Sequence, residues 1–490
     1  MSDKNPIADI KHSELFRESC YIGGQWVKAE SGAFIDVLNP ANGSVIGRTP
    51  ACGQGETARA IRAAEKAQPA WRELTAKQRS DILKRWYELI MNSRDDLALI
   101  MTAEQGKPLA EAKGEISYGA SYIEWFAEES KRVYGDTIPM AQPGKRIIVL
   151  KEPIGVCAAI TPWNFPFAMI ARKVAPALAA GCTMVVKPSE LTPFSAMAMA
   201  QLSEEAGVPA GVLNVLTGQA REIGAELTSS PIVRKLSFTG STAVGKLLMQ
   251  QCASTVKKVS MELGGHAPFI VFDDADIDEA VNGAVASKYR NSGQTCVCAN
   301  RFLVQENIYE EFATKLIKAV TEQLRVGNGF DGEANQGPLI DLNAVIKVEE
   351  QVRDALDKGA KIGCGGKRVK GQGYFFEPTI LLNVTPEMLI SREETFGPVA
   401  PLFSFKTEDE AIAMANDTPY GLASYFYSRD ISRVWRVSEA LEYGMVGVNT
   451  GIMSSEAAPF GGVKESGIGR EGSKYGIDEY MELKYMCLGL

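Results

Sequence analysis

The chain has 490 residues, a length that favours two or more domains. Apolar residues make up 45% and charged residues 23%, which excludes a disordered or collagen-like chain. Fifty-two Lys and Arg against 60 Asp and Glu give a net charge of −8, which argues against nucleic acid as a partner because phosphate contacts need a basic surface.

Histidine and cysteine usage narrows the chemistry further. The two histidines, His12 and His266, cannot build an HExxH motif or a multi-histidine metal site, so we expect no metal. Nine cysteines, an odd number without a CxxC pair, favour free thiols in a reducing compartment. No run of 18 apolar residues occurs and the first ten residues lack an apolar core, so we expect a cytoplasmic protein with no membrane partner.

The N-terminal third predicts an arm with short strands at 21–27 and 34–39, followed by helices from 55 to about 133, where apolar residues recur at three and four positions. The segment 137–155 interrupts this pattern with three prolines, a Pro-Gly turn and a β-rich run. Such a segment is typical of a protruding hairpin.

Five short apolar segments then alternate with helical stretches, at 156–163, 183–188, 212–218, 235–240 and 257–265. This alternation predicts an α/β fold with a doubly wound parallel sheet, whose ligand binds at the carboxyl ends of the strands. After residue 265 the pattern restarts as a second α/β domain, with helices at 276–294, 308–324 and 343–360 and strands at 301–305 and 374–384. The tail, 475–490, predicts a strand.

Two strand ends of the first domain carry candidate cofactor ligands. Gly240, Ser241 and Gly245 follow a strand and open a helix, where backbone amides and a hydroxyl suit a diphosphate. Lys187 and Glu190 follow another strand and suit the two hydroxyls of a ribose. The alternatives are a plain strand–helix turn and a solvated loop.

Three further residues are candidates for catalysis. Cys296 follows a glycine-containing turn, expected at a helix N-terminus, where a thiol has a lowered pKa and acts as a nucleophile; the alternative is a buried structural cysteine. Glu262, at a strand end before two glycines, is a candidate general base or else a solvated carboxylate. Asn164 is a candidate oxyanion donor or else a helix N-cap.

Cys298 lies two residues from Cys296 and is a candidate redox switch, because an oxidised pair would block the nucleophile. The alternative is a small packed residue.

Together these residues resemble a known family. TPWNFP (161–166), KPSE (187–190), FTGSTAVG (238–245), MELGG (261–265), GQTC (293–296), EETFGP (393–398) and PFGG (459–462) resemble the aldehyde dehydrogenase superfamily, in order and spacing. QTCVCANR, EGSKYGIDEY and the KYMC tail look most like its succinate-semialdehyde branch.

The resemblance implies roles for individual residues. It makes Cys296 the nucleophile, Glu262 the general base and Asn164 the oxyanion amide. It implies that Arg172, Arg290 and Ser454 bind a carboxylate on the substrate. Its cofactor positions are Thr161, Pro162, Trp163, Lys187, Ser189, Glu190, Gly240, Ser241, Gly245, Leu263, Glu394 and Phe396. His266 departs from the residues usual at its position.

The resemblance also implies a three-part subunit. A cofactor domain would comprise 1–136 and 156–262, a catalytic domain 263–470, and a small β oligomerisation region 137–155 and 471–490. The expected activity is oxidation of succinate semialdehyde by NAD, with NADP possible, through a cysteine thioester, in a homodimer or homotetramer. Another substrate such as glutarate semialdehyde, or a non-redox thiol hydrolase, are the alternatives.

Overall fold

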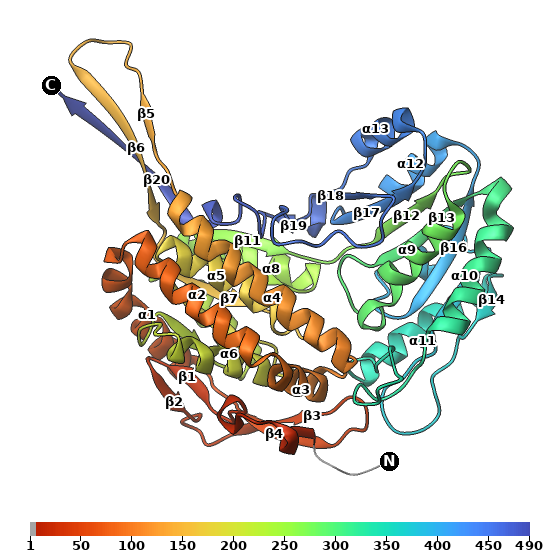
Figure 1. Cartoon of the computed structure of the whole chain (residues 1–490), viewed down its shortest axis with the longest axis horizontal. Helices are drawn as coiled ribbons and strands as arrows, with labels where there is room; N and C mark the ends of the chain where they lie inside the picture. Colours follow the sequence, from red (N-terminus) through yellow and green to blue (C-terminus); the bar gives the residue numbers. More distant parts are fainter. Residues whose placement is uncertain (1–5) are drawn as a thin grey trace.

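Two open sheets, each covered by helices on both faces, form two lobes, and a narrow arm projects from the first (Figure 1). This computed structural model describes residues 6–490. No helix within that range is long and apolar enough to cross a membrane.

The first lobe is built on an eight-stranded sheet in the order β19-β11-β10-β7-β8-β9-β1-β2. Its five central strands run parallel, as the sequence predicts, and the outer ones are antiparallel. The strands are β1 (Cys20–Ile22), β2 (Gln25–Val27), β7 (Val156–Ile160), β8 (Thr183–Lys187), β9 (Leu213–Val215), β10 (Val233–Thr239), β11 (Lys258–Glu262) and β19 (Gly467–Ile468). A separate pair, β3 (Phe34–Leu38) and β4 (Val45–Pro50), lies beside it.

Helices cover both faces of this sheet because its central strands are apolar on both sides. One layer holds α1 (Gln54–Glu73), α7 (Ala220–Ser229) and α8 (Thr242–Cys252). The opposite side holds α2 (Ala76–Asn92), α3 (Arg94–Gln105), α4 (Leu109–Glu129), α5 (Ala168–Ala180) and α6 (Phe194–Glu205). All of α5 is buried, between the sheet and α4.

The second lobe has a seven-stranded sheet in the order β14-β15-β16-β13-β12-β17-β18, parallel except for β14. The strands are β12 (Ala267–Val271), β13 (Ala299–Gln305), β14 (Lys361–Cys364), β15 (Thr379–Leu382), β16 (Val399–Phe405), β17 (Ala423–Tyr427) and β18 (Met445–Val448). Two apolar clusters fill its faces. The helices are α9 (Ile277–Tyr289), α10 (Tyr309–Gln323), α11 (Leu342–Asp357), α12 (Glu408–Asn416) and α13 (Ile431–Ala440).

The arm confirms the predicted hairpin and C-terminal strand and joins them in one sheet. β5 (Asp136–Ile138) and β6 (Lys145–Pro153) form the hairpin, and β20 (Met481–Gly489) pairs antiparallel with the whole of β6. The domain boundaries predicted from the sequence stay a prediction. The short strand β19, from the segment assigned to the catalytic domain, lies in the sheet of the first lobe.

Candidate active site

The carboxyl ends of β7, β8, β10 and β11 lie at one edge of the first sheet, since these strands are parallel neighbours. They carry Thr161, Lys187, Gly240 and Glu262. The loop after β11 reaches the second lobe, where a Cβ on Gly265 would lie 2.5 Å from the carbonyl oxygen of Cys296. The strand-end edge and the Cys296 loop are therefore in direct contact.

Cys296 lies in a turn between a short 3₁₀ helix, Arg290–Gly293, and β13. No helix begins at this cysteine, so the expectation of a helix N-terminus is wrong. The expected lowering of the thiol pKa is also wrong: burial raises the pKa of Cys296 to about 12, against the opposing charge of Arg172. The loop is shaped by Asn291 and Ser292, whose φ angles are +50° and +55°.

Asn164 is buried and points at the Cys296 loop. Its Nδ2 donates to the carbonyl oxygen of Gln294 at 3.0 Å, and its Oδ1 has no hydrogen-bond partner among the described residues. This bond uses one of the two amide hydrogens of Asn164. The alternative of a helix N-cap is excluded, because α5 begins at Ala168 with Phe167 as its cap residue.

Glu262 is not a solvated strand-end carboxylate. It is 4% exposed, and its Oε2 has no hydrogen-bond partner among residues 6–490. Burial, with repulsion from Glu471, raises its pKa well above the usual value although Arg172 and Lys173 oppose the shift. A raised pKa makes the ionised form of this carboxyl group a stronger base, which suits it to take up a proton from water.

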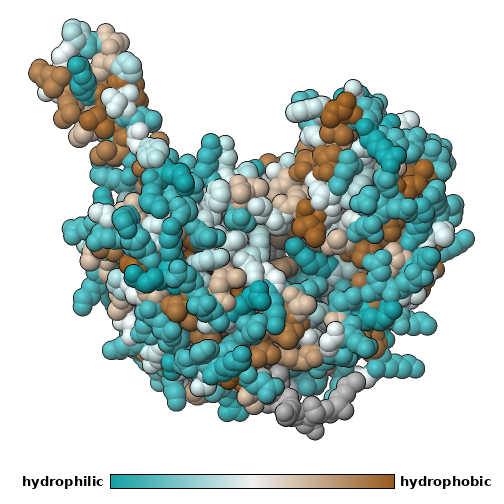
Figure 2. Space-filling view, in the orientation of Figure 1, coloured by the Kyte–Doolittle hydropathy of each residue, from teal (hydrophilic) through white to brown (hydrophobic). Residues whose placement is uncertain are grey.

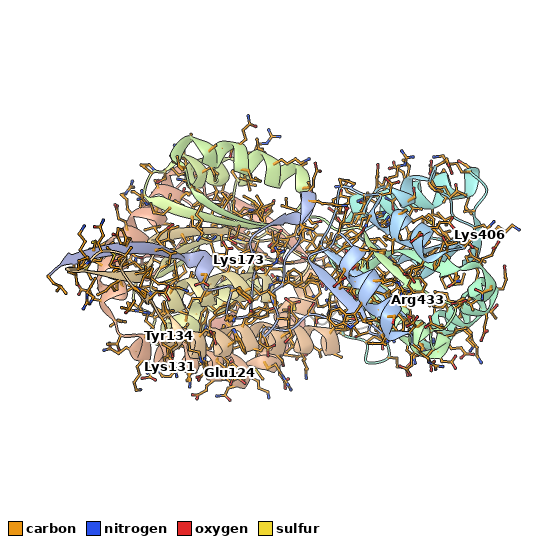
Figure 3. All side chains as sticks on the ribbon, turned by 90° about the horizontal axis from the view of Figure 1, so that it is seen from above. Glu124, Lys131, Tyr134, Lys173, Lys406 and Arg433 are labelled. Carbon is orange, nitrogen blue, oxygen red and sulfur yellow. The ribbon has the colours of Figure 1, made fainter. Side chains whose placement is uncertain are left out.

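The charges around Glu262 come from α5 and from the segment after the PFGG motif. Glu471 contacts Lys173 and forms an ion pair with Arg172 at 2.8 Å, all three buried. Burial raises the pKa of Glu471, but the positive charges of Lys173 and Arg172 outweigh this effect and hold that pKa below its usual value. Figure 3 places Lys173 inside the first lobe, away from the rim where Glu124 and Lys131 lie.

Arg172 is therefore no surface arginine. Its guanidinium carbon lies 3.8 Å from the centre of the Phe460 ring, and the guanidinium forms an ion pair with Glu471. Arg290 and Ser454, by contrast, line one small cavity together with Thr295, beside Cys296. The Arg290 guanidinium lies 5.2 Å from the centre of the Phe165 ring.

The expected cofactor residues form contacts with one another along the strand-end edge. Lys187 and Glu190 form an ion pair at 2.6 Å, and Ser189 caps the following turn. Ser241 is the N-cap of α8, so it opens a helix after a strand as the sequence predicts. A Cβ on Gly245 would lie 2.3 Å from Cδ2 of Leu263, so a larger residue would have to displace the Leu263 side chain. Thr161 keeps a buried hydroxyl with no partner among the described residues.

Glu394 and Phe396 join this set from the second lobe. Gly265 donates its N–H to Glu394 at 3.2 Å, and burial raises the pKa of Glu394 to about 7. The ring of Phe396 meets that of Trp163, the neighbour of Pro162, edge to face at 5.5 Å. His266, the departure from the family pattern, is buried and contacts the carbonyl oxygen of Ser391 through Nε2 at 2.9 Å.

Cys298 is buried and donates to the carbonyl oxygen of Gly293 at 3.2 Å. Both Cys296 and Cys298 are free thiols. Burial raises the pKa of Cys298, with Lys288 opposing. The redox-switch role stays a prediction.

Sequence reasoning missed the buried polar residues behind the site: Lys107, Glu115, Lys173, Asn291, Gln294 and Glu471. Buried charges stand out only once burial is known. Only Lys173 gave a signal in the sequence, since it lies within the apolar segment 168–180.

Comparison with known proteins decides the family. The model of the aldehyde dehydrogenase family matches residues 26–486. The chain belongs to the aldehyde dehydrogenase family.

Relatives of this aldehyde dehydrogenase match over nearly their whole length. It is 64% identical to an NADP(+) succinate-semialdehyde dehydrogenase of Escherichia coli K12, covering 98% of this chain and 100% of that one. It is 63% identical to a glutarate-semialdehyde dehydrogenase of Pseudomonas putida, with the same coverage. A crystal structure of succinate-semialdehyde dehydrogenase from Burkholderia pseudomallei, at 63% identity, superposes with a TM-score of 0.98 over 98% of this chain and 100% of that one.

As an aldehyde dehydrogenase, this protein is an NAD(P)-dependent oxidoreductase that acts on a small aldehyde. The residues present fit a dinucleotide. A helix N-terminus suits the diphosphate, and the buried Thr161 hydroxyl, which follows β7, has no hydrogen-bond partner among residues 6–490. Glu190 and Glu394 offer carboxylates for ribose hydroxyls.

Proposed function

We propose that this aldehyde dehydrogenase oxidises succinate semialdehyde to succinate. The observation that carries the proposal is the small cavity beside Cys296, which Arg290 and Ser454 both line. A guanidinium binds a carboxylate by charge-assisted hydrogen bonds, so this pair suits the carboxylate tail of a semialdehyde. Arg172 lies outside the proposed carboxylate site, because Glu471 already uses its charge.

In the proposed mechanism the Cys296 thiolate attacks the aldehyde carbon. The free Asn164 N–H and the backbone N–H of Cys296 stabilise the oxyanion, each donor worth about 3–4 kcal/mol in comparable sites. Bound NAD(P) would supply the acceptor for the hydride that leaves the carbon bonded to Cys296, so that a thioester would remain on the sulfur. Glu262 then removes a proton from water, and the resulting hydroxide hydrolyses the thioester on Cys296.

The test is NADH or NADPH formation at 340 nm with succinate semialdehyde and with uncharged butanal. Arg290→Ala should raise KM for succinate semialdehyde at least tenfold more than KM for butanal. Arg353→Ala, an exposed arginine of α11, is the matched control and should change neither. Equal effects of Arg290→Ala on both aldehydes would reject the carboxylate site.

Glutarate semialdehyde is a second candidate substrate, favoured by the relative at 63% identity. It is one methylene longer, and a hydrophobic pocket discriminates one methylene by about 1–3 kcal/mol. The ratio of kcat/KM for the two semialdehydes decides between them. A ratio below one for succinate semialdehyde would make the longer substrate the preferred one.

We also propose that the protein assembles as a homodimer or homotetramer and works in the cytoplasm. The exposed apolar residues of β20, Leu483 and Tyr485, support assembly into an oligomer.

The nine free cysteines support a location in the cytoplasm, where thiols stay reduced.

A further inference from the structure

A buried ion pair lies directly behind the Asn164 loop. Lys107 lies in the loop between α3 and α4, and Glu115 in the second turn of α4, so both belong to the corner where the two helices meet. Their charged groups contact each other, and each side chain is 1% exposed. Neither has a role in the mechanism above. Because a buried ion pair is costly to desolvate, it is weak evidence for a contribution to stability. Its contacts point to another role.

The pair holds both ends of one short segment. Lys107 Nζ donates to the carbonyl oxygen of Asn164 at 2.9 Å and lies 4.0 Å from the centre of the Phe165 ring. Glu115 Oε1 accepts the backbone N–H groups of Phe167 and Ala168, at 3.0 and 3.2 Å. These are the residues that open α5, so the segment from Asn164 to the start of α5 is anchored at each end.

The same corner also holds the loop that carries Cys296. Gln105 Nε2 donates to Oδ1 of Asn291 at 3.0 Å, and Glu111 accepts the Asn291 N–H at 2.9 Å. Asn291 Nδ2 in turn donates to the carbonyl oxygen of Asn164 at 3.0 Å. The two sources of oxyanion donors, one from each lobe, are therefore tied to a single corner.

We propose that Lys107, paired with Glu115, is a positioning residue that sets the Asn164 amide against the Cys296 loop. The proposal rests on the oxyanion role proposed for Asn164. Lys107 contacts the backbone of Asn164, so it acts through the amide. Displacing a catalytic group by about 1 Å costs on the order of 100-fold in rate. A shift of the Asn164 backbone should therefore lower the rate of the acylation step.

The test is a double-mutant cycle on the pre-steady-state burst of reduced cofactor at 340 nm. The first change is the paired variant Lys107→Met with Glu115→Gln, which removes both charges and leaves no unpaired buried ion. The second is Asn164→Ala. We expect the paired variant to slow the burst at least tenfold in the wild-type background and less than twofold in the Asn164→Ala background. Cofactor Kd should stay within twofold.

Two further variants keep the test decisive. Lys257→Met is the matched control, since Lys257 is a buried lysine that donates to the carbonyl oxygen of Val233 at 2.8 Å; it should lower Tm without slowing the burst. Asn291→Gly keeps the positive φ of +50° and removes the amide that contacts Asn164. Asn291→Gly should also slow the burst much less in the Asn164→Ala background than in the wild type. It replaces the paired variant in the test if that variant does not fold.

If the paired variant slows the burst by the same factor in the wild-type and Asn164→Ala backgrounds, the inference is overturned. Such independent effects would indicate a general packing effect. A wild-type burst in the paired variant, with a slow Asn164→Ala, would overturn this inference alone. A wild-type burst in Asn164→Ala would overturn the proposed oxyanion role and this inference with it.

Discussion

Cys296 and Glu262 belong to one proposed active site but are expected to act in different steps. Cys296→Ala removes the nucleophile, so no reduced cofactor should form. Glu262→Gln leaves the thiol in place, so one turnover should proceed before the enzyme stalls at the thioester. Stopped-flow absorbance at 340 nm and mass spectrometry of the trapped acyl-enzyme measure both. Absence of a burst in Glu262→Gln would assign Glu262 to activation of the thiol instead.

The burial of Glu262 has a consequence for stability. Its pKa in the folded protein is raised above the value of about 4.3 expected in the unfolded chain, chiefly by burial. The unfolded chain therefore loses this proton at lower pH than the folded protein does. The free energy of unfolding falls as pH rises from about 4.3 toward the folded pKa. Glu262→Gln should melt above the wild type at pH 8.5, by a margin that shrinks at pH 5.5. A margin independent of pH would contradict this assignment.

Glu190 predicts the choice of cofactor. Its carboxylate forms an ion pair with Lys187 at 2.6 Å and can still accept hydrogen bonds from ribose hydroxyls. The same carboxylate would repel a 2′-phosphate, and its ion pair would keep Lys187 from binding that phosphate. We expect NAD to be preferred, although the relative in Escherichia coli is named for NADP(+). Glu190→Ser should shift the kcat/KM ratio toward NADP by at least tenfold. An NADP preference in the wild type would show that another contact decides.

At the scale of elements, the approach of α8 to β11 depends on a missing side chain. A Cβ on Gly245 would lie 2.3 Å from Leu263, the residue after Glu262. Gly245→Ala should therefore displace Leu263 and raise the Kd for NAD several-fold, as overpacking costs about 1–3 kcal/mol.

Gly224→Ala in α7 is the matched control, because its Cβ would meet no atom closer than 4.0 Å. In a helix this change gains about 0.5–1 kcal/mol, so it should raise Tm and leave NAD binding alone. Similar NAD affinities for the two variants, measured by fluorescence titration, would show that α8 adapts without cost to the cofactor site.

At the scale of the whole molecule, the arm carries apolar residues into solvent. Figure 2 shows apolar surface on the arm, and in β20 Leu483 is 71% and Tyr485 64% exposed. The edge of β20 away from β6 pairs with no other strand among the described residues, an arrangement that favours assembly.

Replacing Leu483 and Tyr485 by Lys should therefore split the proposed oligomer into smaller species, seen by sedimentation velocity. Ile346→Lys, which replaces an exposed apolar residue of α11, should leave the sedimentation coefficient unchanged. A wild-type coefficient for the arm variant would place the assembly surface elsewhere.

The sequence by itself determined the alternation of strands and helices, the parallel first sheet and the arm strands. It also placed Glu262, Lys187 and Gly240 at strand ends. Each of these follows from local periodicity and from the rule that parallel strands place their carboxyl ends together. The ordered motifs carried the family.

Only the tertiary structure decided what surrounds those residues. Cys296 lies before a strand and not at a helix start, and its pKa rises because the surrounding residues desolvate the thiol. Arg172 pairs with Glu471, 299 positions along the chain, and Lys107 reaches the backbone of Asn164, 57 positions away. Desolvation and the pairing of buried charges depend on contacts between distant segments, and local periodicity contains no information about them.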